Sequence, residues 1–242
     1  MSALVLLLAL SQYTPQEAQA LFVEANDAYY KADHAAAKAK YEKLLEAGLG
    51  GPDVLFNLGT THLALSELGP AMLYLERAHR LVPDDDVEAN LALARQKQVD
   101  QVVGEDAAVP FTQRLADAVD EPLVSGAFLG SWWLAFVLLW LWRRARGSRV
   151  LLGVAGSGAL AAALALGAVV GTNVWVRRSV IEAVVIPATS KVLEFPGANA
   201  KTAFEVHAGL KVRVMEESGR FVRIRLPNAL EGWTPKDAVV EL

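Results

Sequence analysis

The sequence predicts a multidomain membrane protein made of an all-α helical repeat, a two-helix transmembrane hairpin and a C-terminal all-β barrel. Three observations carry this prediction. Residues 12–106 have helical periodicity and an internal repeat of about 34 residues. Residues 122–142 and 150–176 are uncharged apolar runs, each long enough to cross a bilayer core of about 30 Å. Residues 181–242 hold short β-rich runs separated by turn residues.

The composition and the motifs exclude several classes of functional site. The chain has 242 residues, a net charge of −4 and no cysteine, which excludes disulfides, thiolate metal sites and cysteine nucleophiles. Neither polar segment has the concentrated basic surface of a nucleic-acid binder. The four histidines are scattered, and no phosphate-binding glycine loop or serine elbow stands out. We therefore expect no enzyme, no bound metal or cofactor and no nucleic-acid partner.

The first eleven residues form a signal-like segment. Ser2–Leu10 is a short apolar run, and Ala9-Leu10-Ser11 is a candidate cleavage site of small residues. This arrangement is typical of a secretory signal peptide, although no Lys or Arg precedes the run. The alternative is a disordered or helical N-terminus of a soluble domain. The run is too short to span a membrane.

The clearest copy of the helical repeat is residues 52–85. Gly59 and Ala71 are small, so the two helices of this unit can approach closely. Pro83 cannot continue a helix and forces the turn that closes the unit. With Leu55, Leu58, Leu75 and Ala78, these residues resemble the tetratricopeptide (TPR) consensus.

The repeat also departs from that consensus. His62 stands where the family usually has tyrosine, and Gly69-Pro70 opens the second helix. A weaker copy precedes the clear one, with Asn26 in place of the small residue. Aspartates at 84–86 are expected to cap a further helix over Val87–Val99, which is either a capping helix or a truncated third unit.

The TPR resemblance implies a peptide-binding groove along the first helix of each pair. The groove is expected to be apolar with an acidic rim, and the sequence offers no paired Lys and Arg set that would clamp a carboxylate. The alternative for each residue is packing against the capping helix or the membrane. The predicted groove residues are Val23, Asp27, Tyr30, Phe56, Thr60 and Leu63.

Residues 107–121 form an amphipathic linker. Phe111, Leu115 and Val119 fall on one helical stripe, with polar residues opposite. Such a stripe is typical of a helix lying in the membrane interface. A helix docked on the repeat is the alternative.

The two apolar runs are predicted to be transmembrane helices joined by an Arg-rich loop, residues 143–149. Four arginines in this loop place it in the cytoplasm by the positive-inside rule, so both polar segments are expected in the periplasm. The small residues of the second run allow close helix packing, either on the first run or in a homo-oligomer. The residues proposed for this packing are Gly153, Ser157, Gly167 and Gly171. Neither run holds an ionisable residue, which argues against an ion pathway.

The C-terminal segment is predicted to be a small barrel. In residues 221–226, apolar residues alternate with Phe221, Arg223 and Arg225, as expected of a half-buried strand. The position of Gly209, an aromatic at Phe221 and a Gly232-Trp233 pair resemble the bacterial SH3 family, with a departure at residues 192–197. The resemblance implies binding of cell-wall peptides or protein segments through Phe221 and Trp233, and the alternative is that both belong to the core.

The order of these parts is similar to that of the BatE-type proteins of bacterial aerotolerance operons. This resemblance implies a two-pass inner-membrane scaffold. It also implies two partners, membrane proteins with von Willebrand factor A domains and a MoxR-type ATPase. The alternative function is a cell-wall sensor whose SH3-like domain binds peptidoglycan.

Overall fold

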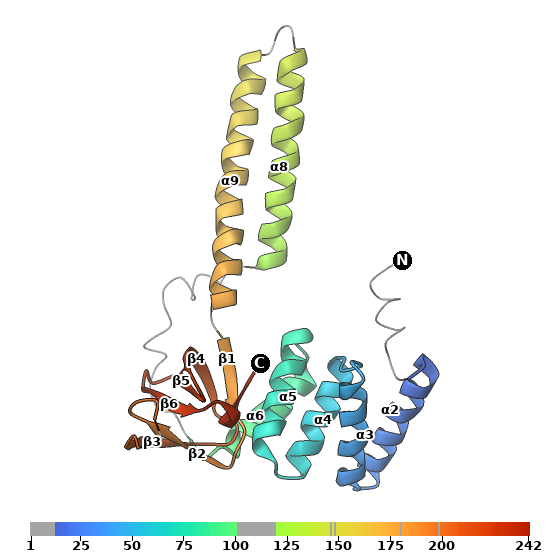
Figure 1. The fold of residues 1–242 in the computed structure, drawn as a ribbon. Coiled ribbons are helices and arrows are strands. Elements are labelled where there is room, and N and C mark those ends of the chain that lie inside the picture. Colours follow the sequence, from blue (N-terminus) through green and yellow to red (C-terminus); the bar gives the residue numbers. More distant parts are fainter. Residues whose placement is uncertain (1–12, 101–119, 146, 148, 180, 198) are drawn as a thin grey trace. The chain divides into compact units, whose positions relative to one another are not determined.

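The computed structural model describes residues 13–100, 120–145, 147, 149–179, 181–197 and 199–242 (Figure 1). The signal-like segment and nearly all of the amphipathic linker lie outside these residues. The chain divides into two compact units. One unit combines residues 1–105 with 181–242, and the other contains residues 106–180. In sequence, the second unit is therefore an insertion into the first.

Five helices, which we call the helical array, form the N-terminal part of the first unit. They are α2 (Pro15–Tyr30), α3 (His34–Glu46), α4 (Pro52–Ala64), α5 (Leu68–Leu81) and α6 (Asp85–Gln96). Each helix packs against the next along the chain, and α4 also contacts α2 and α6 (Figure 1). The predicted helical character of this segment is confirmed. The last helix begins and ends slightly before the predicted 87–99.

Polar side chains fix where these helices begin. Thr14 and Glu17 form a capping box at the start of α2, because each side chain bonds a backbone N–H of the other residue. Asp33 accepts from the Ala36 N–H at the start of α3, and Asp84 accepts from the Asp86 N–H at the start of α6. The predicted capping by the aspartate run is confirmed.

Gly59 is required where α4 and α5 meet. A Cβ atom on Gly59 would lie 2.8 Å from Leu75 Cγ, which is closer than carbon atoms pack. Ala71 and Leu75 are fully buried in the same layer. The interpretation of Gly59 and Ala71 as close-approach residues is confirmed.

Two of the three departures from the consensus, Asn26 and His62, are explained by their contacts with neighbouring helices. Asn26 accepts hydrogen bonds from the Tyr41 hydroxyl and, at 3.1 Å, from Asn57 Nδ2, so it joins α2, α3 and α4. His62 stacks on the Tyr74 ring with centroids 5.4 Å apart. Its Nδ1 lies 2.6 Å from the Glu67 carboxylate, which also pairs with Lys38 at 2.7 Å. Both departures therefore link neighbouring helices.

The C-terminal part is one antiparallel sheet of seven strands in the order β3-β2-β6-β5-β4-β1-β7. The strands are β1 (Ile181–Val185), β2 (Thr189–Leu193), β3 (Thr202–His207), β4 (Lys211–Ser218), β5 (Phe221–Arg225), β6 (Glu231–Pro235) and β7 (Val239–Glu241), with a 3-10 turn at Lys236–Ala238. The predicted all-β character is confirmed, as is the alternation along β5, where Val222 and Ile224 are buried.

The sequence patterns do not predict the hairpin formed by β2 and β3. The reason is that β2 sends a polar residue into the core. Ser190 is buried and its hydroxyl lies 2.9 Å from that of Thr234, which is also buried. This pair satisfies both hydroxyls inside the sheet, but it breaks the apolar alternation by which strands are found in a sequence.

The second unit is a pair of long helices, α8 (Glu121–Arg144) and α9 (Arg149–Ser179). Pro122–Arg144 and Arg149–Trp175 are long and apolar enough to cross a membrane. The two helices pack against each other through most of their length. The predicted pair of apolar helices is confirmed, with bounds close to 122–142 and 150–176.

Candidate functional site

The sheet and the helical array share one apolar core. Val184 on β1 is fully buried in the same cluster as Leu75 of α5 and Leu91 of α6. Ile186, Val240 and Leu242 pack against this cluster from the sheet side. The last helices of the array are therefore covered by residues that follow the apolar hairpin in sequence. We call this contact the array–sheet junction.

Two glycines permit the close contact at the array–sheet junction. A Cβ atom on Gly69 would lie 2.3 Å from the Ile186 carbonyl oxygen, so the start of α5 touches the backbone after β1. Gly209 has φ +85°, and a Cβ atom there would lie 3.1 Å from Leu68 Cγ. Gly69, a departure from the repeat consensus, thus marks where the sheet docks.

Polar contacts surround this apolar centre. Arg77 donates to the Glu241 carbonyl oxygen at 2.6 Å, and Arg80 reaches Glu182 at 2.6 Å. Asp100, just after α6, accepts from the His207 backbone N–H at 2.6 Å, and its other oxygen lies 2.8 Å from His207 Nδ1. These contacts tie α5 to β1 and β7, and they tie the end of the array to the last residue of β3.

Buried charge at the junction is also paired. Glu76 on α5 is 4% exposed. Its carboxylate lies 3.1 Å from Arg95 of α6 and 3.5 Å from Lys211 of β4. Because a buried carboxylate is costly without partners, these two cations explain how it is tolerated.

The predicted groove residues of α2 are exposed. Val23 is 47% exposed and Tyr30 is 85% exposed, and Asp27 lies between them on the same helical face. A shallow hollow beside them is lined by Val23 with residues of the first turns of α2. The side chains of Val23, Asp27 and Tyr30 are therefore accessible to a partner.

The predicted groove residues of α4 are partly covered. Phe56 and Thr60 are half-buried, and Thr60 Oγ1 accepts a 2.9 Å hydrogen bond from Asn90 of α6. Leu63 is 5% exposed and belongs to the core, so the prediction for Leu63 is wrong. The physical reason is that α6 packs directly on α4, which the repeat period alone does not reveal.

Phe221 and Trp233 lie on the outer face of the sheet. Register pairs Phe221 with Pro235 and Arg223 with Trp233, while the intervening residues Val222 and Thr234 are buried. Both aromatic rings are half-buried and neither belongs to the sheet's core cluster. The two residues that sequence analysis singled out therefore share one face, close to the solvent.

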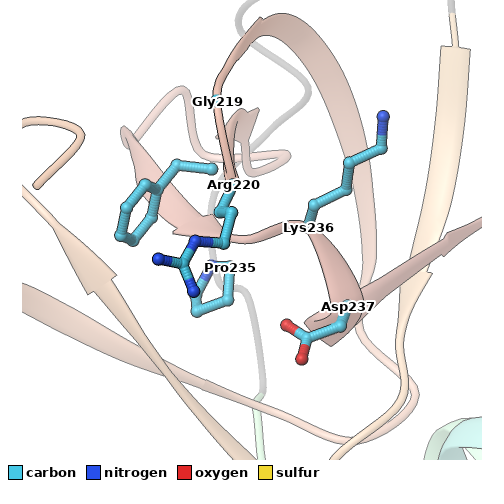
Figure 2. Close-up of a pocket in the computed structure, with 6 residues that line it drawn as sticks. Gly219, Arg220, Pro235, Lys236 and Asp237 are labelled. Carbon is cyan, nitrogen blue, oxygen red and sulfur yellow. The ribbon is translucent and has the colours of Figure 1, made fainter.

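A pocket of about 820 Å³ opens beside Phe221 (Figure 2). It lies between the β4–β5 turn and the 3-10 turn after β6. Its lining residues are Gly219, Arg220, Phe221, Pro235, Lys236 and Asp237. Sequence analysis found Phe221 but missed the others, because the register that brings the two turns together comes from strand pairing. We call this the Phe221 pocket.

The cations around the Phe221 pocket differ in their partners. Lys236 pairs with Glu217 at 2.6 Å, and this hydrogen bond raises the pKa of Lys236. Arg223 lies 2.6 Å from Glu231, and Arg225 also contacts that carboxylate. In the part of the chain that the structure describes, the Arg220 side chain has no hydrogen-bond or ion-pair partner, so its donors are open toward the pocket that it lines.

The small residues of the second apolar helix divide into two groups. Gly153 and Gly167 face α8, because a Cβ atom on them would lie 3.2 Å from Trp142 and 3.1 Å from Phe128. No atom lies within 4 Å of a Cβ placed on Gly171. Ser157 is exposed and its hydroxyl donates to the Gly153 carbonyl oxygen at 2.8 Å. Two of the four residues thus pack within the hairpin and two do not.

Among the residues that the structure describes, no group of three or more His, Asp or Glu side chains could hold a metal ion. Two surfaces are accessible to a partner: the face of α2 that carries Val23, Asp27 and Tyr30, which we call the α2 face, and the Phe221 pocket. No family model matches the chain, and the search of the curated proteins also finds no match.

Proposed function

We propose that the protein is a two-pass inner-membrane adaptor that gathers envelope proteins through a TPR-like array and an SH3-like domain. One observation carries the proposal: the array and the sheet form a single unit, although two apolar helices separate them in sequence. That unit exposes two surfaces, the α2 face and the Phe221 pocket. Two separate surfaces on one unit would allow an adaptor to hold two partners at the same time.

The shared core supports the two-pass topology. Val184 and Leu91 belong to one apolar cluster, so residues 13–100 and 181–242 must lie on the same side of any membrane. Two spans return the chain to its starting side, whereas a single span would separate the two halves. With the Arg-rich loop in the cytoplasm, the array and the sheet lie in the periplasm.

Thiol labelling tests this topology, because the native chain has no cysteine. Single cysteines replace Ser66, Ser148 and Ser218 in cells whose outer envelope has been made permeable. An impermeant reagent is expected to label the Ser66→Cys and Ser218→Cys variants and to spare Ser148→Cys. Labelling of only one of the two polar segments would contradict the two-pass arrangement.

The whole-chain resemblance to BatE-type proteins supplies the partners to test. The adaptor is expected to bind a membrane protein with a von Willebrand factor A domain and, in the same assembly, a MoxR-type ATPase. Co-expression and solubilisation in mild detergent, followed by affinity capture of the full chain, measure this directly. Capture is expected to fall by about fivefold or more when Val23 and Tyr30 are both changed to Ala, or when Phe221 is changed to Ala, as for the loss of an interface residue worth about 1 kcal/mol.

Matched controls separate binding from folding. Leu81 on α5 and Phe195 after β2 are also exposed apolar residues, at 56% and 51%. Their alanine variants lie outside both surfaces and are expected to capture the partner normally. If the surface variants capture as well as the controls do, while all stay folded, the adaptor proposal is wrong.

Purified sacculi test the competing sensor function. The full chain is the right reagent, since an isolated segment 181–242 would expose the junction residues Val184 and Ile186 to water. Sacculus binding that depends on Phe221, in the absence of protein partner capture, would replace the adaptor by a cell-wall sensor.

A further inference from the structure

We infer that the Phe221 pocket binds the C-terminal end of a protein chain whose last side chain is apolar. This inference rests on the proposed adaptor function and names the chemistry that its sheet surface recognises. It uses three features of the pocket: a guanidinium and a carboxylate that have no ion-pair partner among the described residues, and an apolar floor.

The guanidinium is that of Arg220. Figure 2 shows its side chain reaching down beside Pro235, whereas the Lys236 ammonium points away. Lys236 is compensated by Glu217, and Arg223 by Glu231. Arg220 is thus the lining cation whose hydrogen-bond donors are still open within the described residues. A guanidinium binds a carboxylate through two parallel hydrogen bonds, which is its preferred geometry.

The carboxylate is that of Asp237, on the 3-10 turn. It has no ion-pair partner among the residues that the structure describes. Its negative charge disfavours a ligand with several negative charges, such as a phosphate, because like charges repel. It can instead accept a hydrogen bond from a ligand N–H.

The apolar floor consists of Phe221 and Pro235, which are cross-strand neighbours. A volume of about 820 Å³ is large enough for one or two residues of a peptide. The last residue of a chain carries a carboxylate, an N–H and a side chain on one Cα atom. The carboxylate matches Arg220, the N–H matches Asp237, and the apolar side chain matches the floor. An internal acidic residue holds its carboxylate on a flexible stem and does not present them together.

Peptide binding to the full chain in detergent micelles tests the inference by fluorescence anisotropy. The probe is a labelled peptide ending in Val-Leu with a free carboxylate. Two comparison peptides carry a C-terminal amide, and one of these has an added internal Asp. The free acid is expected to bind about tenfold or more tightly than either amide, as expected for a lost charge-assisted hydrogen bond.

Variants of the protein show which residues produce the preference for the free-acid peptide. Arg220→Gln is expected to abolish the preference for the free acid, and Phe221→Ala to weaken binding of all three peptides. Lys201→Gln removes a charge from an exposed site outside the pocket and is expected to keep the preference. Equal binding of acid and amide, equal binding of the internal Asp peptide, or an unchanged preference in Arg220→Gln would overturn the inference.

The same variants separate this inference from the adaptor proposal. If partner capture depends on Phe221 but not on Arg220, terminal-carboxylate recognition is wrong and the adaptor stands. If purified muropeptides bind while the Val-Leu peptide does not, the pocket serves the cell wall and the inference is overturned.

Discussion

The two ends of the helical array differ in what covers them: one end is exposed to solvent and the other packs against the sheet. At the α2 end, Val23 and Tyr30 face solvent. At the α5–α6 end, the array core continues into β1 of the sheet through Val184. Helical repeats need a cap because each one buries its apolar face only against a neighbour. Here the residues that cover the α5–α6 end follow the apolar hairpin in sequence, whereas Val23 and Tyr30 stay exposed at the α2 end.

The largest effect is expected from the close contact at the covered end. Changing Gly69 to Ala places a Cβ atom 2.3 Å from the Ile186 carbonyl oxygen, so α5 and β1 must separate. We expect the free energy of unfolding to fall by about 3 kcal/mol, measured by urea denaturation in mild detergent. Gly197→Ala is the control, because the nearest atom to its Cβ lies at 3.6 Å. Equal stability of the two variants would contradict the docked junction.

A matched pair of valines compares the two ends directly. Val184 is fully buried at the junction, whereas Val23 is 47% exposed on α2. Val184→Ala is expected to lower the free energy of unfolding by about 2 kcal/mol, from lost burial and the cavity left behind. Val23→Ala is expected to change it by less than about 0.5 kcal/mol. A reversed order would mean that the α2 end is the covered one.

A pH effect is expected inside the array rather than at either end. Burial, the largest cause, holds the pKa of His62 below its ordinary 6.5, although Glu67 opposes this. The unfolded chain then binds a proton more readily than the folded chain, so stability falls as pH drops below about 6.5. We expect the free energy of unfolding to fall between pH 7 and pH 5.5, as the unfolded chain takes up a proton that the folded chain resists.

Replacing His62 by Tyr, the residue usual in TPR units, tests whether His62 causes this dependence of stability on pH. The variant is expected to be less sensitive to pH in this range, because its side chain does not titrate there. Glu67 contributes at lower pH, since the hydrogen bond from Lys38 lowers its pKa and that stability is lost only below about 4.5. An unchanged slope in His62→Tyr would assign the effect to another group.

The smallest change in stability is expected at the open end. Tyr30 is 85% exposed, so Tyr30→Ala should alter the free energy of unfolding by less than about 0.5 kcal/mol. Partner capture should nevertheless fall, because exposed aromatic residues often carry interface energy. Thr60 is a poor site for this test, since its hydroxyl bonds Asn90 and a change there disturbs α6. Normal capture by Tyr30→Ala would remove the α2 face from the binding surface.

The elements that follow local patterns were predictable from the sequence. The helices, the apolar pair and strand β5 follow from periodicity, and Gly59 follows from the repeat. The docking of the sheet on the array did not follow, because it depends on contacts between residues more than a hundred positions apart, such as Asp100 and His207. The one sequence signal of this docking is Gly69, which departs from the repeat consensus and lies against Ile186. The Phe221 pocket was only half predictable, since Arg220 and Pro235 meet through strand register.

Cross-linking at the array–sheet junction tests the central claim, that the two polar halves of the chain form one body. Asp100 and His207 are replaced by cysteine in the cysteine-free chain, and intact cells are treated with a short bismaleimide. The docked junction predicts an intramolecular cross-link for this pair and none for a control pair at Tyr30 and Ser218. Proteolysis between residues 101 and 119 then separates the fragment with position 100 from the fragment with position 207, unless the cross-link joins them. Fragments that separate for both pairs would contradict the account.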